Sequence, residues 1–327
     1  MPSAYARRFL RNVVVGAGLA AAAISGLAQQ PYPNRPLRLI VPLAPGGTTD
    51  ILARTLSQQL SGTLGQPMVV ENRSGAGGTV GTDYVAKSPP DGYTLLIISA
   101  DTYTTNAVLY ANLPFDSRKD LKPLSVLAAS PSILTVHPSL PVKTVSQLVA
   151  LSKARPRDLN YGSGGTSGVL RMELLKFNTG MNITNIPYKG SGPALIDQIA
   201  GHVHVGFFNL VATLPQVQSG KLRGLVVTGA KRFDKLPDVP STVESGIKGF
   251  DENVGYLMLA PGATPAGIVA RLNADIVKVL NAPEVKSRLA AEGSEVVGST
   301  SEQATAVVNQ QIDQWVEVVR KTGIKLQ

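Results

Sequence analysis

The stretch Leu39–Leu60, LIVPLAPGGTTDILARTLSQQL, passes from the pattern of a β-strand into the pattern of an amphipathic helix. The turn between them, PGGTTD at 45–50, combines glycines, which allow close approach to the backbone, with threonine hydroxyls. A helix N-terminus carries unpaired N–H groups and the positive end of the helix dipole, so this turn is suited to hold an anion. Asp50 is expected to cap or brace the turn, because a bare carboxylate would repel that anion.

Three more glycine-rich turns precede expected helices. They are Ser74–Thr79 after VVENR, Gly162–Gly168 after LNY, and Lys189–Pro193 after IPY. Each turn taken alone could be explained by a Ser, Thr or Asp that only caps its helix. In an open α/β sheet, however, such turns gather at the carboxyl ends of the strands, where ligands bind. Four turns of this kind therefore favour an anion-binding site.

Short apolar runs alternate with helical patterns along the rest of the chain. Strands are expected at 37–43, 67–72, 93–99, 125–130, 133–138, 203–208, 222–229 and 256–261, and helices at 50–60, 80–87, 144–154, 169–178, 193–200, 265–280 and 302–321. This alternation predicts an α/β fold with parallel sheets and helices on both faces. A length of 327 residues favours two lobes. Trp315 falls at helical spacing and is expected to be a packing residue.

The first 28 residues have the pattern of a secretory signal peptide. Arg7, Arg8 and Arg11 precede an uncharged apolar run, and small residues lead up to Ala28. The run is about 15 residues long, shorter than the ~20 that span a bilayer. Export to the periplasm with cleavage near Ala28 is expected. The chain has no cysteine, so it needs no disulfides there.

The charge of the chain does not favour nucleic acid as a partner. Without the three arginines of the signal peptide the formal net charge falls from +9 to +6, this excess is spread thinly, and only 5% of the residues are aromatic. A mild attraction for small anions is the better inference. His202 and His204 lie two apart on an expected strand and so share one side, but no third metal ligand is evident. No metal and no cofactor are expected.

An enzymatic function has little support in the motifs. Gly75, Gly78 and Gly81 form a G-x-x-G-x-x-G pattern, but four polar residues separate them from the preceding strand, and no acidic residue follows at the spacing of a dinucleotide site. The nucleophile elbow and the phosphate-binding loop are both absent. The chain is therefore expected not to be an enzyme, with a nucleotide-dependent or hydrolytic enzyme as the less favoured alternative.

Many blocks of the chain, in order, resemble a known receptor family. They are YPNRPLRLIVPLAPGGTTDILAR, LGQPMVVENRSGAGGTVGTDYVAKSPPDGYTLL, VHPSLPVKTVSQLVA, LNYGSGG, IPYKGSGPAL, SGKLRGLVVTGAKR, LPDVPSTVESG and LAPGATP. With them the chain looks like the substrate-binding receptors of tripartite tricarboxylate transporters, the Bug family of periplasmic solute receptors.

The resemblance implies a type II periplasmic binding protein, with two lobes that each hold a central β-sheet flanked by helices and a ligand cleft between them. Lobe 1 would comprise 29–130 and 251–327, and lobe 2 would comprise 131–250. The expected function is to bind a small carboxylate, with dicarboxylates and aromatic acids as candidates, and to deliver it as a monomer to the permease subunits of a tripartite membrane transporter. The alternative is a ligand-sensing receptor that acts on a membrane signalling protein.

The resemblance and the glycine-rich turns together indicate the candidate ligand-binding residues. In lobe 1 they are Leu43, Ala44, Pro45, Gly46, Gly47, Thr48, Thr49, Thr79 and Ser99, and in lobe 2 they are Ser163, Gly164, Thr166, Ser167, Lys189, Gly190, Ser191, Phe208 and Asn209.

The sequence departs from the family pattern in lobe 2. Val169 stands where the family has a histidine, and His204 and Phe208 replace two aspartates. If Phe208 faces the cleft, it forms an apolar wall that favours a less polar or aromatic ligand. The alternative is that Phe208 packs in the core of the lobe.

Overall fold

The computed structural model describes residues 32–156, 158–250 and 254–323, so the expected signal peptide lies outside the described residues. The chain divides into two compact units, 1–34 and 35–327. The following description concerns the second unit, which contains all the helices and strands that the structure describes.

The first lobe is built on a six-stranded sheet with the order β11-β4-β10-β3-β1-β2. Its strands are β1 Leu37–Val41, β2 Met68–Asn72, β3 Thr94–Ser99, β4 Leu121–Ser130, β10 Val254–Pro261 and β11 Glu295–Val296. Every residue of β3 and of β10 is buried, in keeping with central strands that are covered on both faces.

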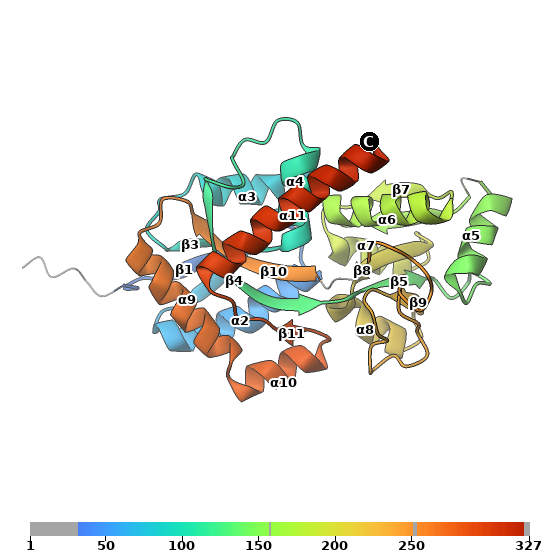
Figure 1. Ribbon diagram of the computed structural model, residues 1–327. Helices are drawn as coiled ribbons and strands as arrows, with labels where there is room; N and C mark the ends of the chain where they lie inside the picture. Colours follow the sequence, from blue (N-terminus) through green and yellow to red (C-terminus); the bar gives the residue numbers. More distant parts are fainter. Residues whose placement is uncertain (1–31, 157, 251–253, 324–327) are drawn as a thin grey trace, which may run out of the picture. The chain divides into compact units, whose positions relative to one another are not determined.

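The second lobe is built on a five-stranded sheet with the order β7-β6-β8-β5-β9. Its strands are β5 Ser132–Val136, β6 Asn160–Ser163, β7 Thr184–Pro187, β8 Val205–Asn209 and β9 Arg223–Val227. Only Pro131 separates β4 in the first sheet from β5 in the second. This short link joins the two lobes (Figure 1).

Both sheets are mixed, so the expectation of parallel sheets holds for only part of each sheet. β1 runs parallel to β2 and β3, but β10 runs antiparallel to β3 and β4. In the second sheet, β5 runs antiparallel to β8 and β9. The physical reason is the connection between lobes: β4 leaves the first sheet toward the second, and β10 enters the first sheet after the chain has passed through the second.

Helices cover both faces of each sheet (Figure 1). They are α2 Thr48–Leu64, the 3₁₀ helix η1 Ala76–Gly78, α3 Thr79–Ala86, α4 Ala100–Leu109, α5 Val145–Ala154, α6 Thr166–Thr179, α7 Ser191–Ile199, α8 Leu210–Gln218, α9 Ala266–Leu280, α10 Pro283–Ala291 and α11 Ser301–Thr322. In the first lobe α3, α4 and α11 lie on one face and α2 and α9 on the other. In the second lobe α5 and α6 lie on one face and α7 and α8 on the other.

The sequence patterns did not predict α4, α8 and α10. Helix α4 is rich in threonine, and most of its first seven residues are buried, so it lacks an amphipathic stripe. Helix α8 contains Pro215, which usually breaks a helix. These helices form because tertiary packing outweighs their local propensity.

Helix α11 begins on the first sheet and runs toward the second lobe (Figure 1). Ile312 is 6% exposed and belongs to the first-lobe core. Trp315, one turn further on, is only half-buried and lines a cavity between α11 and the second lobe. Within the described ranges, no helix combines the length and the apolar character that a membrane crossing requires.

Candidate functional site

The turn quoted at the outset lies directly against a turn of the other lobe. The Ala44 N–H donates a hydrogen bond of 3.0 Å to the Lys189 carbonyl across the lobes. A Cβ atom on Gly192 would lie 2.1 Å from the Pro45 carbonyl oxygen, and one on Gly47 would lie 2.5 Å from Ser191 Oγ. The N-termini of α2 and α7 are therefore in backbone contact, and glycine is needed at position 192 for the lobes to come this close.

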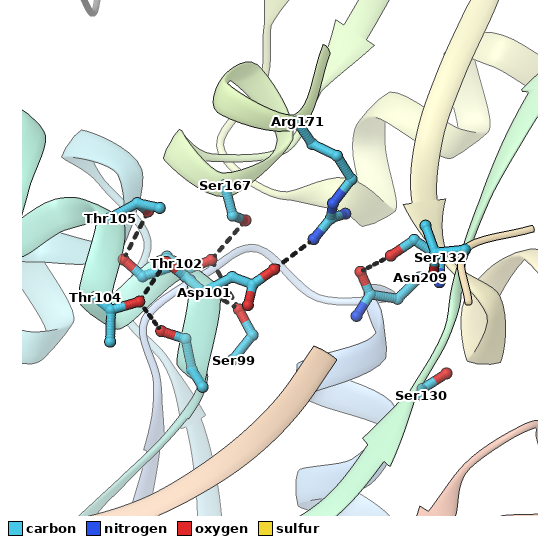
Figure 2. Close-up of polar contacts among 12 residues, drawn as sticks. Ser99, Asp101, Thr102, Thr104, Thr105, Ser130, Ser132, Ser167, Arg171 and Asn209 are labelled. Atoms are coloured by element: carbon cyan, nitrogen blue, oxygen red, sulfur yellow. Dashed lines mark hydrogen bonds and ion pairs between the residues drawn. The ribbon is translucent and has the colours of Figure 1, made fainter. Parts of the chain in front are cut away.

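The N-terminus of α6 joins the same group of turns. A Cβ on Gly164 would lie 2.2 Å from the Ser191 nitrogen. The Thr166 hydroxyl donates to the Asn106 side chain, and the Ser167 hydroxyl lies 2.9 Å from that of Thr102. Helix α4 of the first lobe thus holds the first turn of α6 by hydroxyl contacts (Figure 2).

These three helices begin without a side-chain cap. The N-cap residues of α2, α6 and α7 are glycines, and none of these helices has a side-chain cap hydrogen bond. Side chains cap α4, α5 and α11, whereas α3, α8, α9 and α10 also lack a side-chain cap, so the meeting of the three N-termini is what distinguishes α2, α6 and α7. Three uncapped helix N-termini that meet between the lobes form a positive, donor-rich surface suited to an anion.

Several hydroxyls of the predicted site are buried beside these turns. Thr49 is 6% exposed and Ser163 is 2% exposed. Within the described residues, neither hydroxyl makes a hydrogen bond, and the same holds for Ser191. The structure brings these predicted residues together and leaves their hydroxyls available as donors.

A polar chain continues inward from the turns. The Tyr256 hydroxyl accepts a hydrogen bond from the Asn209 amide, and the Ser132 hydroxyl donates to Asn209 Oδ1 at 3.4 Å. Burial raises the pKa of Tyr256, and the neighbouring Thr48 hydroxyl opposes this rise. Thr48, Tyr256 and Asn209 therefore lie together between the lobes. Tyr256 was not predicted, since it falls within an expected buried strand and carries no motif.

An ion pair that the sequence patterns also did not predict connects the lobes. Arg171 Nη2 on α6 lies 2.7 Å from Asp101 Oδ2 on α4, with side chains 9% and 18% exposed (Figure 2). The two residues are 70 positions apart in the chain, so no local pattern links them. They line a cavity of about 970 Å³ together with Ser132, Thr228 and residues of α11.

Other predicted residues occupy less central places. Pro45, Gly46 and Lys189 are exposed. The hydroxyl of Thr79 donates to the Ala76 carbonyl, so Thr79 stabilises the turn before α3. Ser99 caps α4 and also donates to Thr102. Leu43 is buried at 9% exposure and Ala44 is partly exposed, so the turn presents mainly backbone groups.

Phe208 packs in the core, which is the second of the two alternatives that the sequence left open. It is 4% exposed and packs with Ala194, Leu195 and Ala212. Successive strand residues face opposite sides of a sheet, so Phe207 points toward α6 while Phe208 points toward α7 and α8. An aromatic wall formed by Phe208 in the cleft is therefore not supported.

The two histidines do not lie on a strand, so that expectation was wrong. They precede β8 in a turn, where His204 Nδ1 lies 2.9 Å from Asn160 Oδ1 and the exposed His202 lies 3.5 Å from Asp197. In the part of the chain that the structure describes, no group of three His, Asp, Glu or Cys side chains could hold a metal ion.

The glycines of the dinucleotide-like pattern have a packing role. A Cβ on Gly81 would lie 2.7 Å from the Arg73 carbonyl oxygen and 2.8 Å from Pro42. A Cβ on Gly75 would lie 2.8 Å from Val80 Cγ2 in the first turn of α3. Close approach of α3 to its neighbours thus accounts for glycine at these positions.

Asp50 braces the first turn, as expected. It is 5% exposed and accepts hydrogen bonds from the Gly46 N–H, the Asn72 amide and the Arg54 guanidinium. Burial raises the pKa of Asp50, but the bonds from Arg54, Gly46 and Asn72 outweigh it and hold the pKa below the ordinary value of 3.8.

This arrangement predicts a pH-dependent contribution of Asp50 to stability. At neutral pH we expect Asp50→Asn to lower the free energy of unfolding by about 1–2 kcal/mol, since the Gly46, Asn72 and Arg54 donors lose their ionised acceptor. Because the folded pKa is depressed, this contribution is present above pH 3.8 and is lost as the pH falls through the folded pKa. Thermal melts of wild type and variant should therefore converge in acid.

The control is Glu317→Gln, which removes the exposed ion pair with Lys321 and should leave the melting temperature nearly unchanged. A difference for Asp50→Asn that stays constant into acid would contradict the prediction.

The sequence matches the family described as the tripartite tricarboxylate transporter family receptor over residues 52–324. The chain belongs to this receptor family. A relative from Bordetella pertussis, protein BugT, is 38% identical over 317 residues, which cover 96% of this chain and 97% of the relative. The resemblance to the Bug receptors is thereby confirmed.

Solved structures of similar receptors support the fold. A protein of R. palustris solved with adipate is 38% identical, with a TM-score of 0.85 over 90% of this chain and 99% of that chain. MatC from Rhodopseudomonas palustris, solved with bound malate, is 31% identical, with a TM-score of 0.85 over 88% of this chain and 100% of that chain. The receptor therefore has the two-lobed α/β fold of the periplasmic binding proteins.

Proposed function

We propose that this receptor binds a small carboxylate between its lobes, in the periplasm, and delivers it as a monomer to the permease of a tripartite tricarboxylate transporter. The observation that carries the proposal is the meeting of three uncapped helix N-termini, those of α2, α6 and α7, at the contact between the lobes. Membership of the receptor family and the adipate and malate in similar structures support the same ligand class.

The carboxylate would accept hydrogen bonds from backbone N–H groups and from nearby hydroxyls. We propose as its contacts Gly47, Thr48 and Thr49 in the first lobe, and Ser163, Gly164, Thr166, Ser167, Gly190 and Ser191 in the second. Oriented backbone dipoles can hold an anion without a dedicated cation. The lobes would comprise 29–130 with 251–327, and 131–250.

Ligand binding would favour the closed form of the receptor. The donors of α2 belong to one lobe and those of α6 and α7 to the other, so an anion reaches all of them only when the lobes are together. A ligand with higher affinity for the closed form shifts the population toward it. The closed form is then the state that a membrane permease would recognise, and no chemical conversion of the ligand is part of this function.

A thermal-shift screen tests the proposed ligand class. The purified receptor is heated with mono-, di- and tricarboxylates, aromatic acids, NAD and ATP, and adipamide serves as the uncharged control for adipate. A ligand at about 1,000 times its Kd should add about 4 kcal/mol to the free energy of unfolding. We expect stabilisation by carboxylates and none by adipamide. Stabilisation by NAD or ATP alone would contradict the proposal and direct attention to the Gly75–Gly81 turn.

A further inference from the structure

Helices α4 and α6 face each other across the two lobes through polar side chains (Figure 2). The Thr105 hydroxyl donates a hydrogen bond of 3.2 Å to the Thr166 hydroxyl, which in turn donates to the Asn106 side chain. One turn nearer the start of α4, the hydroxyls of Thr102 and Ser167 lie 2.9 Å apart. Thr102, Thr105 and Asn106 are at most 2% exposed. The contact between the two helices is therefore buried and held by hydrogen bonds.

The ion pair of Arg171 with Asp101 belongs to the same contact. Arg171 Nη2 lies 2.7 Å from Asp101 Oδ2, and the two side chains are 9% and 18% exposed. The guanidinium also lies over the ring of Phe207, with 5.6 Å between Cζ and the ring centroid. Phe207 belongs to the second lobe, as Arg171 does, so part of the desolvation of the guanidinium does not depend on lobe closure. Pairing with Asp101 then adds attraction when the lobes close.

Each of the two helices uses its apolar residues within its own lobe. Ala100 and Tyr103 of α4 belong to the first-lobe core, whereas Met172 and Leu175 of α6 belong to the second-lobe core. Separating the helices moves hydroxyl, amide and charged groups into water, which can replace their partners. Apolar surface has no such compensation in water. The contact can therefore form and separate while the core of each lobe stays intact.

We propose that these polar side chains form a latch that holds the lobes closed before a ligand binds. The α4–α6 latch consists of Asp101, Thr102, Thr105 and Asn106 on α4 and Thr166, Ser167 and Arg171 on α6. It sets the fraction of receptor molecules that are already closed. Because the apparent Kd is the Kd of the closed form divided by this fraction, the latch sets the affinity for every ligand by the same factor.

This inference rests on the proposed function, since it concerns the closure that ligand binding favours. Asp101 and Arg171 are positioning residues, because they act through the closed arrangement of the lobes and not through contact with the ligand. Thr166 and Ser167 contribute their hydroxyls to the latch, and the unpaired N–H groups of the first turn of α6 are left for the anion.

The test measures closure in the dialysed receptor without added carboxylate. The chain has no cysteine, so Lys119→Cys in the first lobe and Lys221→Cys in the second provide two specific attachment points for spin labels at exposed positions. Electron-spin distance measurements then give the fractions of open and closed molecules. In the same labelled background, titration calorimetry gives the affinities for adipate and for malate.

The variant is Arg171→Met with Asp101→Asn, which removes both charges together and leaves no unpaired buried charge. The matched control is Arg271→Met with Asp275→Asn, which removes an Arg–Asp ion pair within α9 of the first lobe. We expect the variant to lower the closed fraction and to weaken the binding of both acids about three- to tenfold. The loss of affinity should equal the fall in the closed fraction. The control should change neither quantity.

An unchanged closed fraction in the folded variant would overturn the latch. A loss of affinity for one acid only would also overturn it, because it would place Arg171 in contact with the ligand. Failure of the wild type to bind any carboxylate would overturn the proposed function itself, and the distance measurement would still test the latch.

A second pair of variants tests the hydroxyl contacts without changing any charge. Thr105→Val removes a hydrogen bond between the lobes, whereas Thr104→Val removes bonds to the Ala100 carbonyl and Gln311 within the first lobe. Both residues are 0% exposed, and valine has nearly the shape of threonine. We expect Thr105→Val to lower the closed fraction and Thr104→Val to leave it unchanged. Equal effects of the two substitutions on the closed fraction would contradict the latch.

Discussion

Replacing Gly192 by alanine is expected to weaken carboxylate binding about 10- to 100-fold, because the added Cβ prevents the lobes from closing. That Cβ would lie 2.1 Å from the Pro45 carbonyl oxygen, 2.9 Å from the Gly46 carbonyl carbon and 3.0 Å from the Gly47 nitrogen. All three atoms are backbone atoms of the other lobe, so no side chain can rotate away to make room. Titration calorimetry with the best carboxylate of the screen measures the effect.

The second lobe itself should tolerate this change. Gly192 is the second residue of α7, and alanine is favoured over glycine in helices by about 0.5–1 kcal/mol. The matched control is Gly267→Ala, at the second position of α9, where an added Cβ meets nothing within 4 Å. It should leave binding unchanged. Wild-type affinity in Gly192→Ala would mean that ligand binding does not require the contact between α2 and α7.

Leu257→Ala is expected to lower the free energy of unfolding by about 2–5 kcal/mol, a large share of the 5–15 kcal/mol typical of a folded protein. Leu257 is fully buried in β10, the strand that lies between β3 and β4, and it pairs with Ile98 on one side and Val126 on the other. Loss of its side chain leaves a cavity in the core of the first lobe. The surrounding strands cannot fill this cavity without breaking the hydrogen bonds that join them.

Urea denaturation followed by circular dichroism measures this change. The control is Val69→Ala on β2, an edge strand of the same sheet, where the side chain is 54% exposed. That variant should change the free energy of unfolding by less than about 0.5 kcal/mol. Similar effects of the two substitutions would contradict the placement of β10 at the centre of the sheet.

The glycine-rich turns of the site could be predicted from local sequence. The PGGTTD turn predicted a helix N-terminus, and α2 begins at Thr48 within it. The turns before α6 and α7 were recognised in the same way, because glycine next to Ser or Thr between a strand and a helix is a local signal. Asp50 was also expected to brace its turn, since its partners Gly46 and Arg54 lie within four residues of it.

The residues that sequence reasoning missed act over long separations. Arg171 and Asp101 are 70 positions apart, and Tyr256 lies 47 positions from Asn209, which was itself predicted. Neither pair carries a motif, and only the folding of two sheets into facing lobes brings each pair together. Phe208 shows the same limit, since its position on the strand did not reveal that helices cover both faces of its sheet.

The sequence by itself determined the alternation of strands and helices, the glycine-rich turns and the receptor family, because periodicity and turn chemistry are local properties of the chain. Tertiary structure alone decided the antiparallel entry of β10, the backbone contact between Gly192 and Pro45, and the ion pair that lines the cavity. These features depend on which surfaces meet when two lobes pack, and packing depends on residues that are distant in sequence and close only in space.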